Sequence, residues 1–167
     1  MRNLLTALLT TGALLGAAGG ASAGTATTTF TVTATVNTNC RVSAAPLTFN
    51  YTPGLGDVTN STTVTVNCTK GTAFNTALTQ GLTTGSSIAQ RLLNDGAAGD
   101  TLQYNLYTSS ALTTPWGVTI NTDTVPGTGT GMGAAVTQTV YGKVVDSANQ
   151  GIPPGTYSDT ITVNVTY

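Results

Sequence analysis

The residues that could carry out chemistry in this chain are few. It contains two cysteines, Cys40 and Cys68, and six acidic residues that are all aspartate, whereas histidine and glutamate are absent. Nucleophilic catalysis needs a nucleophile beside a base, and no such pair can be assembled from this set. Two aspartates could act together on a glycosidic bond, but Asp57, Asp95 and Asp100 adjoin Gly or Asn, as turn residues do. We therefore expect no catalytic residues, no metal site and no cofactor.

The first 23 residues predict a cleaved signal peptide. Arg2 supplies a short positive region, residues 4–18 are apolar but shorter than a membrane span, and Ala21-Ser22-Ala23 is a small-residue cleavage site. The alternative is an uncleaved membrane anchor, which the shortness and the Gly/Ala content of the segment disfavour. Cleavage after Ala23 leaves residues 24–167, the size of one domain. We expect this mature chain to be exported and to have no transmembrane span.

The cysteine pair predicts one disulfide between Cys40 and Cys68. An even number of cysteines in an exported chain favours pairing. A metal or redox site is the alternative, but the sequence has neither a C-x-x-C motif nor a histidine to complete a zinc site. A cross-link would close a loop of about 29 residues and stabilise the fold by about 3.6 kcal/mol in the chain-entropy model.

The charge of the chain is too low for several classes of partner. Only 7% of residues are charged, and without Arg2 four cations face six carboxylates, a net charge of −2. Nucleic acids and anionic membrane surfaces require clusters of Lys and Arg, so we expect neither as a partner. A surface of low charge and many threonines fits a protein that packs against copies of itself, or simply a β-rich extracellular protein.

Residues 25–36 form the clearest pattern of the sequence. Every odd position is threonine, and the even positions include four apolar residues: Phe30, Val32, Ala34 and Val36. Strict alternation places these four on one face of an extended strand. We interpret residues 24–36 as a donor strand that completes the sheet of a neighbouring subunit, with these four residues facing inward. The alternative is an ordinary edge strand of the same molecule, because Asn37-Thr38-Asn39 would permit a turn back.

The remaining residues, 37–167, predict an all-β sandwich. Short alternating runs are separated by Gly, Pro, Asn and Asp, and no helical period is sustained. We expect six principal strands and one short one, over residues 40–49, 62–68, 74–80, 101–108, 135–145, 157–167 and 91–93. Pro46 predicts a bend in the first of these, and residues 126–133 predict a loop. We expect Trp116 in the core or a subunit contact, with a sugar platform as the alternative.

A seven-stranded immunoglobulin-like sandwich would need one more strand after Tyr167. We therefore expect an apolar acceptor groove between the last strand and the first strand after Cys40. Its expected wall residues are Val42, Leu47, Phe49, Ile161, Val163, Val165 and Tyr167.

Several fragments, in their order along the chain, resemble one family. They are residues 29–36 (TFTVTATV), 39–43 (NCRVS), 66–71 (VNCTKG), 104–107 (YNLY), 116–117 (WG), 140–144 (VYGKV) and 155–167 (GTYSDTITVNVTY). With them the chain resembles the spore coat protein U domain family, and within it the major subunits of archaic, Csu-type chaperone–usher pili.

The resemblance implies an incomplete immunoglobulin-like sandwich that lacks its last strand. It also implies a periplasmic chaperone and an outer-membrane usher as partners, head-to-tail assembly with copies of itself, and a cell-surface fibre for attachment and biofilm formation. The alternatives are an adhesive binding module and a secreted spore-coat or matrix protein with a self-completed sandwich. A single domain with a strong donor candidate favours the structural subunit.

Overall fold

The computed structural model describes residue 20, residues 22–96 and residues 99–167. The predicted signal peptide therefore lies almost wholly outside the described residues. The chain divides into two units, Met1–Thr35 and Val36–Tyr167. In the first unit, the described residues belong to no strand or helix and are exposed.

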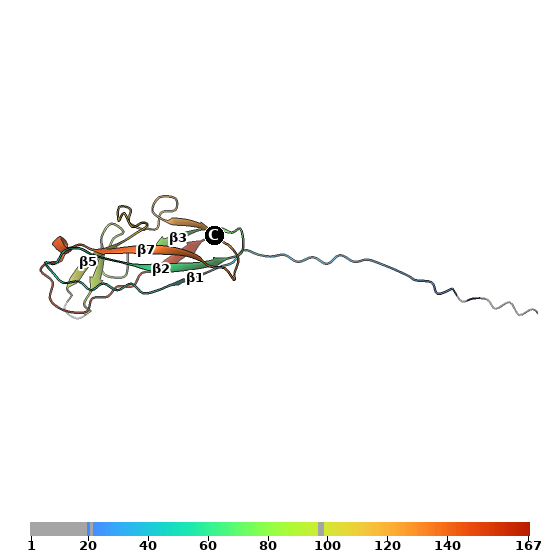
Figure 1. The fold of residues 1–167 in the computed structure, drawn as a ribbon, viewed down its shortest axis with the longest axis horizontal. Helices are drawn as coiled ribbons and strands as arrows, with labels where there is room; N and C mark the ends of the chain where they lie inside the picture. Colours follow the sequence, from blue (N-terminus) through green and yellow to red (C-terminus); the bar gives the residue numbers. More distant parts are fainter. Residues whose placement is uncertain (1–19, 21, 97–98) are drawn as a thin grey trace, which may run out of the picture. The chain divides into compact units, whose positions relative to one another are not determined.

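The second unit is an all-β sandwich, as predicted, with eight strands and one short 3-10 helix among its described residues. In chain order these are β1 (Cys40–Ala44), β2 (Val58–Cys68), β3 (Ala73–Leu78), β4 (Arg91–Asn94), β5 (Thr101–Tyr107), β6 (Val125–Thr128), β7 (Val136–Val144), η1 (Asp146–Ala148) and β8 (Val163–Thr166). One sheet has the order β1-β2-β7-β5-β4 and the other β6-β3-β8, and all pairs are antiparallel. Figure 1 shows β1, β2 and β7 running side by side.

The core lies between the two sheets. It is built from the alternate strand residues that the sequence pattern predicted to face inward. Val64, Val66 and Cys68 of β2 are buried, and so are alternate residues of β5. Trp116 is fully buried, and its Nε1–H donates to the Thr76 carbonyl over 2.8 Å. The core interpretation of Trp116 is thus confirmed, and its burial contradicts an exposed sugar platform.

The predicted disulfide between Cys40 and Cys68 is confirmed. The two cysteines face each other in the register of β1 and β2, so the bond joins neighbouring strands. Cys68 is fully buried, and the bond anchors the start of β1 to the core.

Several predicted strand bounds were wrong, and the strand expected over residues 62–68 begins four residues earlier, at Val58. Residues 126–133 were expected to form a loop, but β6 occupies Val125–Thr128 and pairs with β3. Pro126 is tolerated there because β6 is an edge strand, and Gly127 leaves room for the ring of Phe74. The last strand was expected over residues 157–167, but β8 begins only at Val163.

The first strand was expected over residues 40–49, yet β1 ends at Ala44. Beyond it the chain crosses the core face of β2, where Thr62 Oγ1 donates to the Ala45 carbonyl over 2.9 Å. Asn60 Nδ2 donates to the Thr48 carbonyl over 2.8 Å. These side chains replace the strand ladder, so residues 45–53 form a strap across the sheet. The strap carries Leu47 and Phe49 to the core, where both are half-buried.

Candidate functional site

An apolar groove with a volume of about 1010 Å³ opens between the two sheets. Leu47 and Phe49 of the strap line one side, and Ile161 and Val163 line the other. Its floor consists of core side chains from four strands: Val64, Leu78, Leu102, Tyr104, Leu106 and Val140. These floor side chains are themselves buried, whereas the wall residues Leu47, Phe49, Ile161 and Val163 are only half-buried, so the groove reaches down to the core and its exposed apolar surface comes from its walls.

One edge of the groove is the unpaired edge of β8. The Thr162 carbonyl accepts from the Thr79 N–H over 3.1 Å, and the Thr162 N–H donates to Thr79 Oγ1 over 3.0 Å. The backbone of Thr162 therefore faces β3. Because backbone polar groups alternate along a strand, those of Ile161, Val163 and Val165 face the opposite edge. Within the described part of the chain, no strand pairs with that edge.

The edge of β1 is unpaired in the same way. The Ala45 N–H donates to the Thr63 carbonyl over 3.0 Å, so the odd-numbered residues of this segment direct their backbone groups to β2. The groups of Val42 and Ala44 consequently face away from β2, where the described residues supply no partner strand. Two open strand edges therefore flank one apolar groove, an arrangement that invites pairing with another chain.

The structure brings together four of the seven predicted acceptor residues. Leu47, Phe49, Ile161 and Val163 all line the groove. Val165 is half-buried and packs against the core on the same phase of β8 as Val163. Val42 lies opposite the buried Val66 but remains 41% exposed.

The remaining predicted acceptor residue and the predicted donor residues are solvent-exposed. Tyr167 is 56% exposed and lies beyond the end of β8. Phe30, Val32 and Val36 are 79–87% exposed, and Ala34 is exposed as well. These exposed apolar side chains lie at every second position. Their role as the inward face of a donor strand stays a prediction from the sequence.

A polar network anchors the far end of the strap. Asp146 Oδ1 accepts from the Tyr51 hydroxyl over 2.7 Å and from the Gly54 N–H over 2.8 Å. The hydrogen bonds from Tyr51 and Gly54 hold the pKa of the Asp146 carboxyl below its ordinary value. Desolvation and the hydrogen bond to Asp146 raise the pKa of Tyr51 to about 12. Because Tyr51 also lines the groove, this network positions one of its walls.

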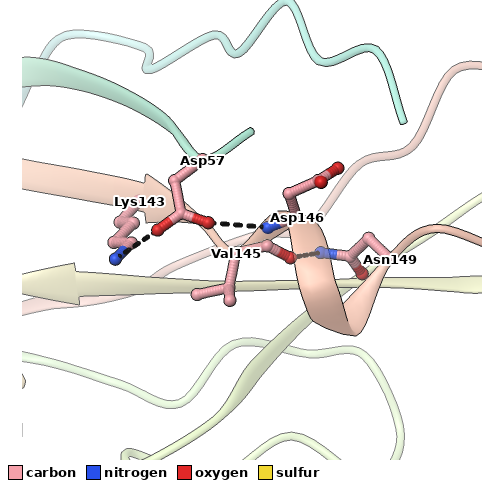
Figure 2. A network of polar contacts seen from close by, with 5 residues as sticks. All are labelled: Asp57, Lys143, Val145, Asp146 and Asn149. Carbon is pink, nitrogen blue, oxygen red and sulfur yellow. Dashed lines mark hydrogen bonds and ion pairs between the residues drawn. The ribbon is translucent and has the colours of Figure 1, made fainter. Parts of the chain in front are cut away.

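Asp57 extends the network to β7, as Figure 2 shows. Its Oδ1 accepts from the Asp146 N–H over 2.9 Å, and its Oδ2 lies 2.6 Å from Lys143 Nζ. The hydrogen bond from Lys143 is the main cause that lowers the pKa of Asp57. Sequence reasoning placed Asp57 in a turn and missed this role, because its partners lie almost ninety positions away.

A carboxylate at the groove was also missed by sequence reasoning. Asp159 Oδ2 accepts from the Tyr104 hydroxyl over 2.8 Å, and its Oδ1 accepts from the Leu82 and Thr83 N–H groups over 2.9 and 3.1 Å. Burial and the bond to Asp159 raise the pKa of Tyr104. The floor of the groove therefore presents a neutral phenol whose hydroxyl is already satisfied.

Comparison with known proteins identifies the family of this fold. The model of the spore coat protein U domain matches residues 26–164. The chain belongs to the spore coat protein U domain family. No curated protein matches it in sequence.

The spore coat U fold of this chain is similar to a solved structure of an assembly complex. That structure is the CsuC–CsuE chaperone–tip adhesion subunit pre-assembly complex from archaic chaperone–usher Csu pili of Acinetobacter baumannii. The TM-score is 0.55 at 22% sequence identity, over 80% of this chain and 41% of the matched chain. The likeness is one of fold, and this chain spans less than half the length of the chain it matches.

The spore coat U sandwich also contains a buried cation that the sequence gave no reason to expect. The guanidinium of Arg91 is fully buried and donates to the carbonyls of Thr79 and Trp116 over 3.0 and 2.6 Å, and to Asn105 Oδ1 over 2.6 Å. Desolvation lowers the pKa of Arg91. Backbone carbonyls carry no sequence signal, so this contact could not be predicted from residue types.

The described residues form neither a membrane-spanning helix nor a metal-binding cluster. They contain no helix that is both long and apolar enough to cross a membrane. They also contain no cluster of three or more His, Cys, Asp or Glu residues that would hold a metal ion.

Proposed function

We propose that this chain is a structural subunit of a surface fibre that polymerises by donor-strand exchange. Residues 25–36 of one copy fill the groove of the next copy, between β8 and the edge formed by β1 and the strap. The observation that carries the proposal is the apolar groove flanked by two unpaired strand edges. One added strand would satisfy both edges and cover the half-buried apolar walls of the groove, which is the logic of strand addition.

The proposed donor matches the groove in both chemistry and period. Phe30, Val32, Ala34 and Val36 would enter it from one face of the strand, while the threonines face outward and favour extended structure. Burial of each large side chain contributes on the order of 1.5–3 kcal/mol, to which the main-chain hydrogen bonds add. Phe30 is the largest of the four, and we expect it to contribute most.

The resulting contact extends from copy to copy into a fibre and is not the self-complementary contact of a symmetric dimer. The donor strand and the acceptor groove are different surfaces, so the interface is heterologous and head-to-tail. Each added copy offers a new groove or a new donor strand. A low surface charge is consistent with such packing between copies.

The matched structure supports a proposal about the partners during assembly. In that complex a tip adhesion subunit is held by a chaperone before assembly. We propose that a periplasmic chaperone likewise covers the groove of this chain, and that an outer-membrane usher exports it to the cell surface. The role is structural rather than enzymatic, in attachment and biofilm formation.

Assembly of the mature chain with and without residues 24–36 tests the proposal. We expect filaments in electron micrographs and multimers on SDS gels of unheated samples for the mature chain only. A synthetic peptide of residues 25–36 should stabilise the shortened chain. If the mature chain is instead a monomer whose residues 25–36 resist hydrogen exchange, the strand completes its own sandwich. The chain would then be a matrix protein or a binding module.

A further inference from the structure

Gly142 occupies a crowded position on the core face of β7. Its neighbours on this face, Val140 and Val144, are buried. A Cβ atom at position 142 would lie 2.5 Å from Cζ of Phe49 and 2.6 Å from Cδ2 of Leu47. Glycine inside a strand weakens the strand, and it often marks a site of close approach. Here the two side chains that approach Gly142 are both strap residues that line the groove.

The backbone of the strap has little freedom to retreat from position 142. Thr62 holds the Ala45 carbonyl, and Asn60 holds the Thr48 carbonyl, over 2.9 and 2.8 Å. The hydrogen bond between the Tyr51 hydroxyl and Asp146 Oδ1 anchors the other end of the strap. A side chain at position 142 would therefore displace the flexible tips of the strap residues rather than the strap itself.

Those tips border open space on the groove side. Phe49 packs against Tyr104 on the groove floor, with ring centroids 6.3 Å apart and planes inclined by 57°. Leu47 and Phe49 contact the position of a Cβ at residue 142 on one side and line the groove on the other. Added volume at residue 142 would therefore push these two side chains toward the groove, because the core beneath them is already packed.

We propose that Gly142 sets the width of the groove. It is a positioning residue, which keeps Leu47 and Phe49 back in the wall so that the groove can accept a donor strand from a second copy of the chain. This inference rests on the proposed function. It adds that the donor is admitted only while position 142 lacks a side chain.

Uptake of a labelled peptide of residues 25–36 into the mature chain during assembly tests the inference. Gly142→Ala is compared with Gly133→Ala, because a Cβ at position 133 meets no atom within 4 Å. We expect Gly142→Ala to fold, with the disulfide intact, and to take up at least about tenfold less peptide, since overpacking a well-filled site is unfavourable. Gly133→Ala should take up as much as the parent chain.

A rescue variant separates the width of the groove from a general loss of stability. Leu47→Val and Phe49→Leu remove the atoms that a Cβ at residue 142 would meet. Combined with Gly142→Ala, they should restore peptide uptake to within about threefold of the parent chain, because the two truncations remove the overlap with the new Cβ and take away more volume than it adds. A variant that had merely lost stability would not be rescued by two further truncations.

The outcomes distinguish this inference from the proposed function. Normal peptide uptake by a folded Gly142→Ala chain overturns the inference and leaves donor-strand exchange intact. Failure of the rescue variant to fold or to take up peptide overturns it as well. Failure of the parent chain and of Gly133→Ala to take up peptide overturns the proposed function, and the inference with it.

Discussion

The Tyr51 hydroxyl donates to Asp146 Oδ1 over 2.7 Å and thereby joins the strap to the 3-10 helix η1 that follows β7. The two residues are 95 positions apart, and the same carboxylate oxygen accepts from the Gly54 N–H. Asp57 bonds the backbone of Asp146 and also pairs with Lys143. The wall of the groove is therefore held by a polar network at its end rather than by a strand ladder.

Loss of the Tyr51 hydroxyl should loosen this wall. Tyr51→Phe keeps the ring and removes one charge-assisted hydrogen bond to Asp146, so we expect a lower thermal midpoint and faster hydrogen exchange of the strap amides. Tyr141→Phe, on β7, removes the same atom away from Asp146 and serves as the control. Equal exchange rates in the two variants would show that the bond does not position the strap.

The network should make stability depend on acid pH. Asp57 and Asp146 have pKa values below their ordinary 3.8 in the folded chain, so as the pH falls toward 3.8 the unfolded chain binds protons before the folded chain does. The contribution of these two carboxylates to the free energy of unfolding is therefore present above the pKa of the unfolded chain. It is lost as the pH falls through the lower pKa values of the folded chain. Urea midpoints measured from neutral to strongly acid pH should fall. Asp57→Asn and Asp146→Asn should each flatten the profile.

Removal of the disulfide should destabilise the fold without changing its topology. With a separation of 28 residues, Cys40→Ala/Cys68→Ala should cost about 3.6 kcal/mol in the chain-entropy model. Urea unfolding of this variant, compared with the oxidised and reduced parent chain, measures the cost. The reduced parent and the variant should agree; a variant as stable as the oxidised chain would contradict the expectation.

The buried Arg91 should tolerate no apolar replacement. Arg91→Met leaves the Thr79 and Trp116 carbonyls without their donor, and each unsatisfied buried acceptor costs about 1–3 kcal/mol. We expect a loss of about 2–5 kcal/mol in the free energy of unfolding. Arg41→Met, at an exposed residue of β1, should change stability by no more than about 0.5 kcal/mol. Similar losses in the two variants would contradict a specific role for Arg91.

The two faces of the proposed donor strand should behave differently. Phe30→Asp places a charge on the inward face and should reduce detergent-resistant multimers roughly tenfold or more, because the large apolar burial is lost. Thr31→Asp adds the same charge on the outward face and should leave assembly near that of the parent chain. Quantified gels of unheated samples measure both. Equal loss in the two variants would argue that residues 25–36 do not enter a groove by alternate side chains.

Local patterning was enough to predict most of the strands and the buried phases of β2 and β5, and the cysteine count of an exported chain was enough to predict the disulfide. Period-two alternation is a property of neighbouring residues, so Val64, Val66 and Leu102 could be assigned to the core without knowing their partners. Local patterning could not predict β6, because Pro126 and Gly127 are residues typical of loops. The segment is a strand only because it pairs with the distant β3. Local patterning also extended the first strand through residues that form the strap.

Residue types and their order along the chain were enough to predict the family, the all-β class and the alternating faces of residues 25–36, since each of these is a pattern of neighbouring residues or of short fragments in sequence. Only the tertiary structure decided that Leu47 and Phe49 share a groove with Ile161 and Val163. It also decided that Gly142 makes room for them, and that Arg91 and Asp146 bind distant backbone groups. Such contacts depend on how strands far apart in the chain pack together. The positions of backbone groups and of empty space cannot be read from residue types.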